Sequence, residues 1–222
     1  MTDRAKWSLA ACLCSLLGFA TLASLTYGGG SFGSLDARIL HWLYGYRHTE
    51  WESLAHLLYG LANPLPQLVL LAGASAIAWR RGLRRHALAA AVLVVGADLT
   101  TQLLKLALSH PRYQPILGFW QINPTSFPSG HSTAAMSMAL AYLLVAPVAW
   151  RAAVVTLGGA LVLGVGCSVV LLHYHYPSDV LGGWLVAAAW FFAIVACLPP
   201  DAQAPWSSQG RKRAPSAVVD RL

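Results

Sequence analysis

Charged side chains are scarce in this sequence. Lys, Arg, Asp and Glu together make up 10% of the 222 residues, whereas a soluble domain carries about 25%. A chain with so few charges cannot cover its own core with polar side chains, which excludes a water-soluble monomer. The hydrophobic content of 57% is also far too high for an intrinsically disordered chain. The composition therefore predicts an integral membrane protein of one domain.

Cysteine is also rare, and its placement excludes a disulfide framework. Cys12 and Cys14 lie in the first apolar run of the sequence, and Cys167 and Cys197 lie in later ones. The sequence contains no Cys-x-x-Cys pair and no spacing of cysteine and histidine that is typical of a metal site. The formal net charge is +7, but the basic residues fall between the apolar runs. We therefore interpret them as a topology signal and expect no nucleic-acid partner.

Six charge-poor segments are long enough to cross a bilayer as helices, which takes about 20 apolar residues. They are residues 7–27, 57–79, 87–108, 132–150, 152–172 and 180–198. The second is interrupted by Asn63-Pro64-Leu65-Pro66. The first follows basic residues as a cleaved signal would, but its apolar run is long, and we interpret it as a retained span. The predicted fold class is all-α, a polytopic membrane helix bundle with six transmembrane helices.

The positions of the basic residues predict how the spans are oriented. Cytoplasmic segments of membrane proteins carry an excess of Lys and Arg. If the N-terminus is cytoplasmic, eleven of the 15 basic residues fall on the inner side: Arg4, Lys6, Arg80, Arg81, Arg84, Arg85, Arg151, Arg211, Lys212, Arg213 and Arg221. We therefore expect both termini in the cytoplasm.

Two segments are not predicted to span the membrane. Residues 28–63 have apolar side chains at helical spacing, with Trp42 and Trp51 beside them, which is typical of short helices in the membrane interface. The segment from Pro199 contains Pro, Ser and basic residues without periodicity, which predicts disorder. The predicted division is a membrane domain over 1–198, including the outer interfacial loop 28–63, and a disordered basic cytoplasmic tail over 199–222.

Polar residues gather at the predicted outer ends of four spans. The set comprises Lys105, Arg112, Ser129, Gly130, His131, His173, His175 and Asp179. Each of them taken singly has an ordinary structural role, such as a lysine that reaches toward the headgroups or a serine that caps a helix. Their convergence on one membrane face instead favours a functional site.

The chemistry that suits this set is phosphoryl transfer. The start of the fourth span presents the Ser129 hydroxyl and the N–H groups around Gly130, where the positive end of the helix dipole binds anions. Two nearby cations add to this attraction, and two histidines can divide the work of nucleophile and acid. His175 and Asp179 are four residues apart across a turn, close enough for the carboxylate to hold one ring nitrogen and direct the other at phosphorus.

No metal site and no cofactor are expected. The sequence has no cluster of carboxylates that could hold Mg²⁺. His173 and His175 point to opposite sides if the segment is extended, and no third ligand is evident. A metal-free mechanism is therefore favoured.

Asp98 is a further polar residue, inside the third span. With Thr101, Gln102 and Lys105 it forms a stripe at three- and four-residue spacing. An acidic residue within a membrane is a functional candidate by default, but polar partners on the same face favour a buried structural network. Asp98 is kept as an accessory candidate.

Three motifs resemble those of the type 2 phosphatidic acid phosphatase superfamily. They are Lys105 and Arg112 with six residues between them, Pro128-Ser129-Gly130-His131, and Ser168, His175 and Asp179 with six and three residues between them. Six helices, both termini inside and motifs on the outer face also match the layout of bacterial membrane members of that family.

The resemblance implies a role for each of these residues. His175 would be the nucleophile that forms a phosphohistidine, and Asp179 would orient it. His131 would protonate the leaving oxygen and later activate water. The phosphoryl oxygens would be held by Lys105, Arg112, Ser129 and the Gly130 amide.

The sequence departs from the family pattern at two positions. Tyr113 follows Arg112 where the family has proline, and Val169 stands where the family has a phosphate-binding arginine. We expect Val169 near the outer end of the fifth span, where its side chain could reach the same cavity. His173, about one helical turn beyond, is the nearest accessory candidate to fill the gap.

These expectations combine into a lipid phosphatase of the inner (cytoplasmic) membrane, with its active site on the extracytoplasmic side. The resemblance implies a phosphomonoester or pyrophosphate of a lipid in the outer leaflet, of the prenyl pyrophosphate, phosphatidylglycerol phosphate or phosphatidate type. The expected partners are this lipid and the bilayer, with no obligate protein partner. Two alternatives stay open: a catalytically weak or silent homologue that binds or transports a phospholipid, and a lipid phosphotransferase.

Overall fold

The chain folds into a bundle of α-helices. The computed structural model describes residues 1–28, 31–46, 49–109, 111–119 and 121–198, and no β-strand occurs in these ranges. The same ranges contain eight α-helices: α1 (Asp3–Tyr27), α2 (Ser31–Leu43), α3 (Glu50–Leu61), α4 (Pro64–Arg80), α5 (Arg84–Ala107), α6 (Gly130–Val145), α7 (Arg151–Leu171) and α8 (Pro177–Cys197). Short 3₁₀ turns cover Tyr44–Tyr46, Pro115–Leu117 and Val148–Trp150. The all-α prediction is confirmed, and the predicted tail 199–222 lies outside the described residues.

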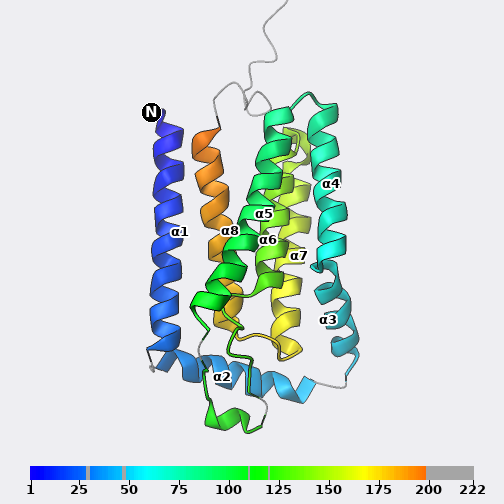
Figure 1. Ribbon diagram of the computed structural model, residues 1–222. Helices are drawn as coiled ribbons and strands as arrows, with labels where there is room; N and C mark the ends of the chain where they lie inside the picture. Colours follow the sequence, from blue (N-terminus) through cyan, green and yellow to red (C-terminus); the bar gives the residue numbers. More distant parts are fainter. Residues whose placement is uncertain (29–30, 47–48, 110, 120, 199–222) are drawn as a thin grey trace, which may run out of the picture.

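Most of the helices run side by side, and α2 lies across one end of them (Figure 1). The first residues of α1 and the last residues of α8 lie together at the opposite end of the bundle (Figure 1). The cytoplasmic location predicted for both termini stays a prediction, but the two ends of the membrane domain do share one side.

In the part of the chain that the structure describes, four helical segments are long and apolar enough to cross a membrane: Asp3–Tyr27, Arg84–Ala107, Val148–Leu171 and Pro177–Cys197. Helices α3 and α4 meet the same criterion together but bend by 54° at the break between them. Helix α6 has 16 residues and is about 24 Å long at about 1.5 Å per residue, less than a bilayer core of about 30 Å. The chain is a multi-pass membrane protein, and the count of six spans stays a prediction.

Helix α6 occupies the interior of the bundle, in contact with α4, α5, α7 and α8. Much of its buried face consists of small side chains, and Ala134, Ala135 and Ala141 are almost completely buried. Small side chains let neighbouring helices approach closely. Because protein rather than lipid surrounds α6, this helix does not have to match the thickness of the bilayer.

The bend between α3 and α4 follows from the Asn63-Pro64-Leu65-Pro66 sequence. Proline lacks an N–H and fixes its own φ angle, so it ends one helix and suits the first turn of the next. Pro64 is accordingly the first residue of α4, and Asn63 is its N-cap. Helix α3, expected as a separate interfacial helix, packs along α7 and leads into this bend.

Helix α2 is anchored on the ends of α7 and α8 by its apolar face. Ala37 and Leu40 are completely buried in a cluster that includes Val169, Tyr176 and Val180. The opposite face is open, with Trp42 largely exposed. This amphipathic arrangement is what the apolar spacing in 28–63 predicts for an interfacial helix.

Candidate active site

The sequence-predicted site residues come from three junctions at the α2 end of the bundle. Lys105 lies in the last turn of α5, and Ser129 to His131 begin α6. His175 lies on the turn between α7 and α8, and Asp179 is in the first turn of α8. Arg112 belongs to the loop between α5 and α6.

Asp179 holds His175 as the four-residue spacing predicts. The Nδ1 atom of His175 lies 3.3 Å from Oδ2 of Asp179. The same carboxylate oxygen accepts a 3.0 Å hydrogen bond from the N–H of Tyr176, the N-cap of α8. An acidic residue three positions after the N-cap commonly makes this reciprocal bond. Asp179 is completely buried, so local helix-capping geometry fixes the carboxylate that orients the histidine.

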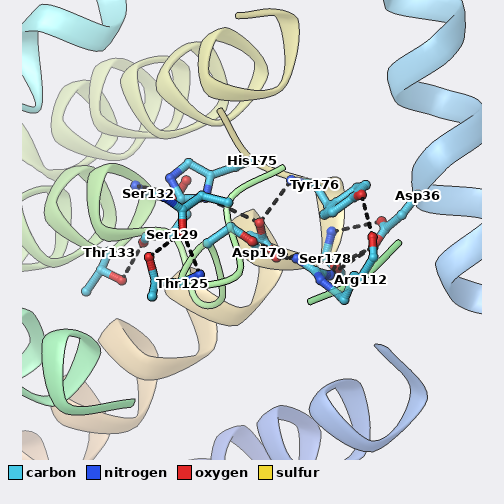
Figure 2. Close-up of polar contacts among 12 residues, drawn as sticks. Asp36, Arg112, Thr125, Ser129, Ser132, Thr133, His175, Tyr176, Ser178 and Asp179 are labelled. Atoms are coloured by element: carbon cyan, nitrogen blue, oxygen red, sulfur yellow. Dashed lines mark hydrogen bonds and ion pairs between the residues drawn. The ribbon is translucent and has the colours of Figure 1, made fainter. Parts of the chain in front are cut away.

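The second oxygen of Asp179 binds Arg112. The guanidinium forms an ion pair with Oδ1 of Asp179 and donates hydrogen bonds to the hydroxyls of Ser126 (2.8 Å) and Ser178 (3.1 Å). Figure 2 shows Asp179 in the middle, with His175 on one side and Arg112 on the other. The role of Arg112 as a phosphoryl ligand stays a prediction, because in this structure its hydrogen bonds go to protein groups.

Asp36 on α2 completes this cluster, and sequence reasoning missed it. Its carboxylate accepts hydrogen bonds from the N–H of Ser178 at 3.1 Å and from the Ser178 hydroxyl, and lies 3.7 Å from Nη1 of Arg112. Burial raises the pKa of Asp36 to about 6, against the opposing effects of the Ser178 hydrogen bonds and the Arg112 charge. One signal was available: Asp36 precedes Leu40 by four residues, so a carboxylate occupies the face predicted to be apolar.

The Pro-Ser-Gly turn at the start of α6 is bonded to α8. The Ser129 hydroxyl accepts a 3.3 Å hydrogen bond from the N–H of Ser132 and so caps α6. The Ser129 N–H donates to the carbonyl of Asp179 at 2.8 Å. A Cβ on Gly183 would lie 2.6 Å from the Ser129 carbonyl oxygen. Only glycine permits this approach, which brings the N-termini of α6 and α8 together.

Lys105 reaches the first residue of α6. A Cβ on Gly130 would lie 3.9 Å from Nζ of Lys105 and 3.6 Å from Nε2 of Gln102. Among the described residues, Lys105 makes no ion pair or hydrogen bond. A lysine amine beside a helix N-terminus forms an anion site. The structure thus brings together the predicted phosphate ligands Lys105, Ser129 and Gly130.

His131 is held by two residues from the bend between α3 and α4. Its Nε2 lies 3.1 Å from Oδ1 of Asn63. Its ring stacks on the ring of Tyr59, with centroids 4.0 Å apart and an angle of 28° between the planes. Sequence reasoning treated Asn63 as part of an interruption and did not single out Tyr59, because nothing local links either residue to position 131.

The two accessory candidates make structural contacts. The ring nitrogens of His173 face the carbonyl oxygens of Leu171 at 2.8 Å and Leu40 at 3.2 Å, which ties the end of α7 to α2. Asp98 accepts a 2.6 Å hydrogen bond from Gln67 of α4. These contacts favour the buried-network interpretation of Asp98 and a linking role for His173.

Val169 is not where the sequence reasoning expected its side chain. It is completely buried in the apolar cluster beneath α2, beside Ala37 and Leu40. The expectation that position 169 faces the phosphate cavity is therefore wrong, because α2 covers this face of α7. Its backbone is closer to the site, since the Val169 carbonyl accepts a 3.2 Å hydrogen bond from the N–H of His175.

Within the described ranges, no group of three or more His, Cys, Asp or Glu residues could hold a metal ion. The expectation of a metal-free, cofactor-free reaction stays a prediction. What the arrangement offers chemically is an oriented histidine, a second histidine with a fixed ring, and an anion site between them and Lys105.

Comparisons with known proteins agree with this chemistry. The family model of the PAP2 superfamily matches residues 86–202, more than half of the chain. Two similar curated proteins are lipid A 1-phosphatases, from Rhizobium johnstonii (34% identical over 112 residues) and Rhizobium etli (33% identical over 112 residues). Each match covers 46% of this chain, and 43% and 46% of the two relatives respectively, so the chain matches less than half of their length.

One solved structure is similar over most of the chain. It is the PAP2-type phosphatidylglycerolphosphate phosphatase of Bacillus subtilis, with a TM-score of 0.69 and 23% sequence identity. The match covers 83% of this chain and 94% of that one. At this identity the likeness establishes the fold.

Proposed function

The chain belongs to the PAP2 superfamily, and on that premise we propose that it is a membrane lipid phosphatase. It hydrolyses a phosphomonoester or pyrophosphate of a lipid at the end of the bundle that bears α2. The observation that carries this proposal is the pairing of His175 with Asp179 beside the N-terminus of α6. An oriented histidine next to an anion site serves phosphoryl transfer rather than membrane packing.

Two observations support a lipid as the substrate. The relatives reported above are, by name, phosphatases of lipid A and of phosphatidylglycerolphosphate. A mostly apolar cavity of about 730 Å³ also opens between α2, α3, α7 and α8, within the usual range for ligand sites of about 300–1,000 Å³. Trp42, Leu58 and Trp184 are among its lining residues. We assign this cavity to the hydrocarbon chain, with prenyl pyrophosphate, phosphatidylglycerol phosphate and phosphatidate as the candidate substrates.

In the first step His175 attacks phosphorus. Because Nδ1 faces Asp179, the nucleophile is Nε2. The new P–N bond forms as the P–O bond to the leaving group breaks, and His131 donates a proton to the departing oxygen. Asp179 stabilises the positive charge that develops on the His175 ring. The product is a phosphohistidine and the dephosphorylated lipid.

In the second step water hydrolyses the phosphohistidine. His131, now neutral, accepts a proton from the water whose oxygen attacks phosphorus, and the P–N electron pair returns to His175. Inorganic phosphate leaves. In both steps Lys105, Ser129 and the Gly130 N–H hold the phosphoryl oxygens, and one such contact is worth about 2.7–4 kcal/mol in a water-excluded site.

Arg112 has two proposed tasks. Its ion pair with Asp179 keeps the carboxylate in place behind His175. As a phosphoryl ligand it would have to exchange one of its protein partners for a phosphoryl oxygen. The buried negative charge of Asp36 and Asp179 stabilises the guanidinium in either arrangement.

The proposed location is the inner (cytoplasmic) membrane, with the site facing the extracytoplasmic side and the substrate arriving from the outer leaflet. The excess of basic residues in the opposite loops supports this orientation. The amphipathic α2 would lie in the outer interface, where it can admit acyl or prenyl chains to the cavity.

Of the alternatives, a weak or silent homologue is favoured by one observation, the valine at position 169. The retained pairing of His175 with Asp179 favours turnover instead. A lipid phosphotransferase would use the same phosphohistidine and differ in the acceptor that enters in the second step.

The test is phosphate release from a panel of lipid phosphates by the full chain in detergent micelles. We expect release from at least one lipid, persistence in EDTA, and loss in His175→Ala. His41→Ala is the matched control, because His41 is an exposed histidine of α2, and it should keep wild-type activity. Phosphate release by His175→Ala at the wild-type rate would refute the proposal. Transfer of phosphate to an added lipid alcohol instead of water would identify a phosphotransferase.

A further inference from the structure

Asn63 begins α4 without capping it. An asparagine at the N-cap normally accepts a hydrogen bond from the N–H of the second or third helical residue. Within the described part of the chain, the Asn63 side chain makes no such bond. The third helical residue is Pro66, which has no N–H to donate. The side-chain amide is therefore available for another partner.

That partner is His131, 68 positions further along the chain. Oδ1 of Asn63 lies 3.1 Å from Nε2 of His131. Tyr59, four residues before Asn63, stacks on the face of the same ring. The two residues lie on either side of the 54° bend between α3 and α4. The bend thus supplies one contact to the edge of the imidazole and one to its face.

The chemistry of the amide oxygen decides which nitrogen of His131 carries a proton. An amide oxygen can only accept a hydrogen bond, so Nε2 must be protonated to bond with it. In the neutral ring the lone pair then lies on Nδ1. Nδ1 is therefore the nitrogen that can exchange a proton with the reacting groups.

We propose that Asn63 is a positioning residue that keeps Nε2 of His131 protonated throughout the reaction, so that Nδ1 is the catalytic nitrogen. This inference rests on the proposed function. In the first step the proton on Nδ1 of the imidazolium passes to the leaving oxygen, and the ring becomes neutral. In the second step Nδ1 takes a proton from the attacking water, and the imidazolium is restored. The Nε2 proton stays with Asn63 in both steps.

The neutrality of Asn63 is part of the assignment. Among the residues that the structure describes, the titratable groups that act on His131 are Tyr59 from α3, Lys105 from α5 and His175 from the turn before α8. An aspartate at position 63 would keep the hydrogen-bond acceptor and add a negative charge next to the ring. This charge would stabilise the imidazolium form of His131. Asn63→Asp therefore tests the effect of the charge next to the ring while the ring keeps its hydrogen-bond acceptor.

The kinetic test compares Asn63→Leu and Asn63→Asp with the wild type on the best lipid phosphate. We expect Asn63→Leu to lower kcat about 10- to 100-fold with KM nearly unchanged, a part of the contribution of about 10²–10⁴ from general acid–base catalysis. Asn63→Asp should keep kcat within about tenfold and move the limb of the pH profile that reports His131 to higher pH by about one unit or more. In a His131→Ala background, Asn63→Leu should have no further effect. Asn123→Leu is the control, because Asn123 is an exposed loop residue whose side chain bonds to Thr125.

A second readout needs no turnover. In ¹⁵N-histidine NMR spectra of the full chain in micelles, with His131→Gln to assign the signal, neutral His131 should be protonated on Nε2. Asn63→Leu should give a mixture of the two tautomers. A neutral ring protonated on Nδ1, or a wild-type kcat and pH profile in Asn63→Leu, would overturn the inference. If no lipid releases phosphate but His131 is still protonated on Nε2, the proposed function is refuted. The positioning of His131 by Asn63 would then still stand.

Discussion

The two histidines of the site are held by acceptors of different charge. His175 faces the carboxylate of Asp179, and His131 faces the amide of Asn63. A carboxylate fixes the ring and also stabilises positive charge on it, which suits a nucleophile that becomes cationic when it is phosphorylated. An amide also fixes the ring but, being neutral, stabilises positive charge on it less, which suits a residue proposed to release a proton. The difference fits the two roles proposed above, a nucleophile beside a charged acceptor and a proton donor beside a neutral one.

The two pairs also differ in how they are built. The His175–Asp179 pair spans four residues and uses the capping geometry of α8. The His131–Asn63 pair joins two helices that are distant in the sequence, and a bent helix pair carries it. The first pair is therefore as rigid as one helix turn, whereas the second depends on how α4 packs against α6.

The largest expected effects come from the His175–Asp179 pair, the histidine first and its charged acceptor second. His175→Ala should lower kcat about 10⁵-fold or more, and Asp179→Asn about 10³- to 10⁴-fold, as in other sites where a carboxylate orients a catalytic histidine. Because Asn63→Leu is expected to cost only about 10- to 100-fold, the two acceptors should differ by at least about tenfold. Steady-state phosphate release measures all three variants. Equal losses in Asp179→Asn and Asn63→Leu would break the comparison between a charged and a neutral acceptor.

The next effect concerns the His175 side, where the family arginine is missing. Val169→Arg should destabilise the protein, because the guanidinium would enter the apolar cluster beneath α2, and an uncompensated buried charge costs about 3–5 kcal/mol. Thermal unfolding in micelles should show a large fall in Tm, and activity should fall with it. Val169→Ala, which adds no charge, should lower the Tm by less. If Val169→Arg instead has a wild-type Tm and a higher kcat/KM, the side chain at position 169 reaches the phosphate site beside His175.

The smallest expected effect is a pH dependence of stability that comes from Asp36. This carboxylate contacts Arg112, which in turn pairs with Asp179. Its folded-state pKa of about 6 lies above the ordinary value for an aspartate, about 3.9. Between these values the folded state binds more protons than the unfolded state, so the free energy of unfolding falls as pH rises from about 4 to about 6. Above pH 6 the full cost of the ionised carboxylate is present.

This pH dependence can be measured by comparing the Tm of Asp36→Asn, which cannot titrate at position 36, with the Tm of the wild type. The Tm of the variant minus the Tm of the wild type should become more positive as pH rises from about 4 to about 6, and then stay constant. His41→Ala, another change on α2, should show no such trend. A Tm difference between Asp36→Asn and the wild type that is independent of pH would mean that Asp36 is not a buried titrating group.

The parts of the site that sequence reasoning reached are those made by local structure. The spacing of His175 and Asp179 and the capping serine at 129 depend on one turn of chain, so pattern alone was sufficient. Asp36 and Asn63 act on partners 142 and 68 positions away, and no local pattern encodes such pairs. The buried face of Val169 was missed for the same reason, since α2 covers it.

The spans show the same division between local and distant causes. Four of the predicted segments, 7–27, 87–108, 152–172 and 180–198, each match one helix with boundaries within a few residues. The predicted second span, 57–79, instead falls on the end of α3 and on α4, which are separated by the bend. The predicted fourth span, 132–150, ends early, because α6 stops at Val145 and Pro147 follows Ala146. Proline restricts the residue before it and cannot donate a helical hydrogen bond. The bend at Asn63 was visible as a Pro-rich interruption, but its angle depends on packing against α7.

The close approach of α8 to the Pro-Ser-Gly turn has an entropic consequence. At Gly183 and at the bond from the Ser129 N–H to the Asp179 carbonyl, main chain meets main chain. Contacts of this kind contain no side-chain torsions, so no rotamers have to be frozen when an anion arrives. The Gly130 amide and the residue that orients His175 are therefore preorganised relative to each other. For the proposed lipid substrate, binding energy from the rest of the molecule would not have to be used to align them.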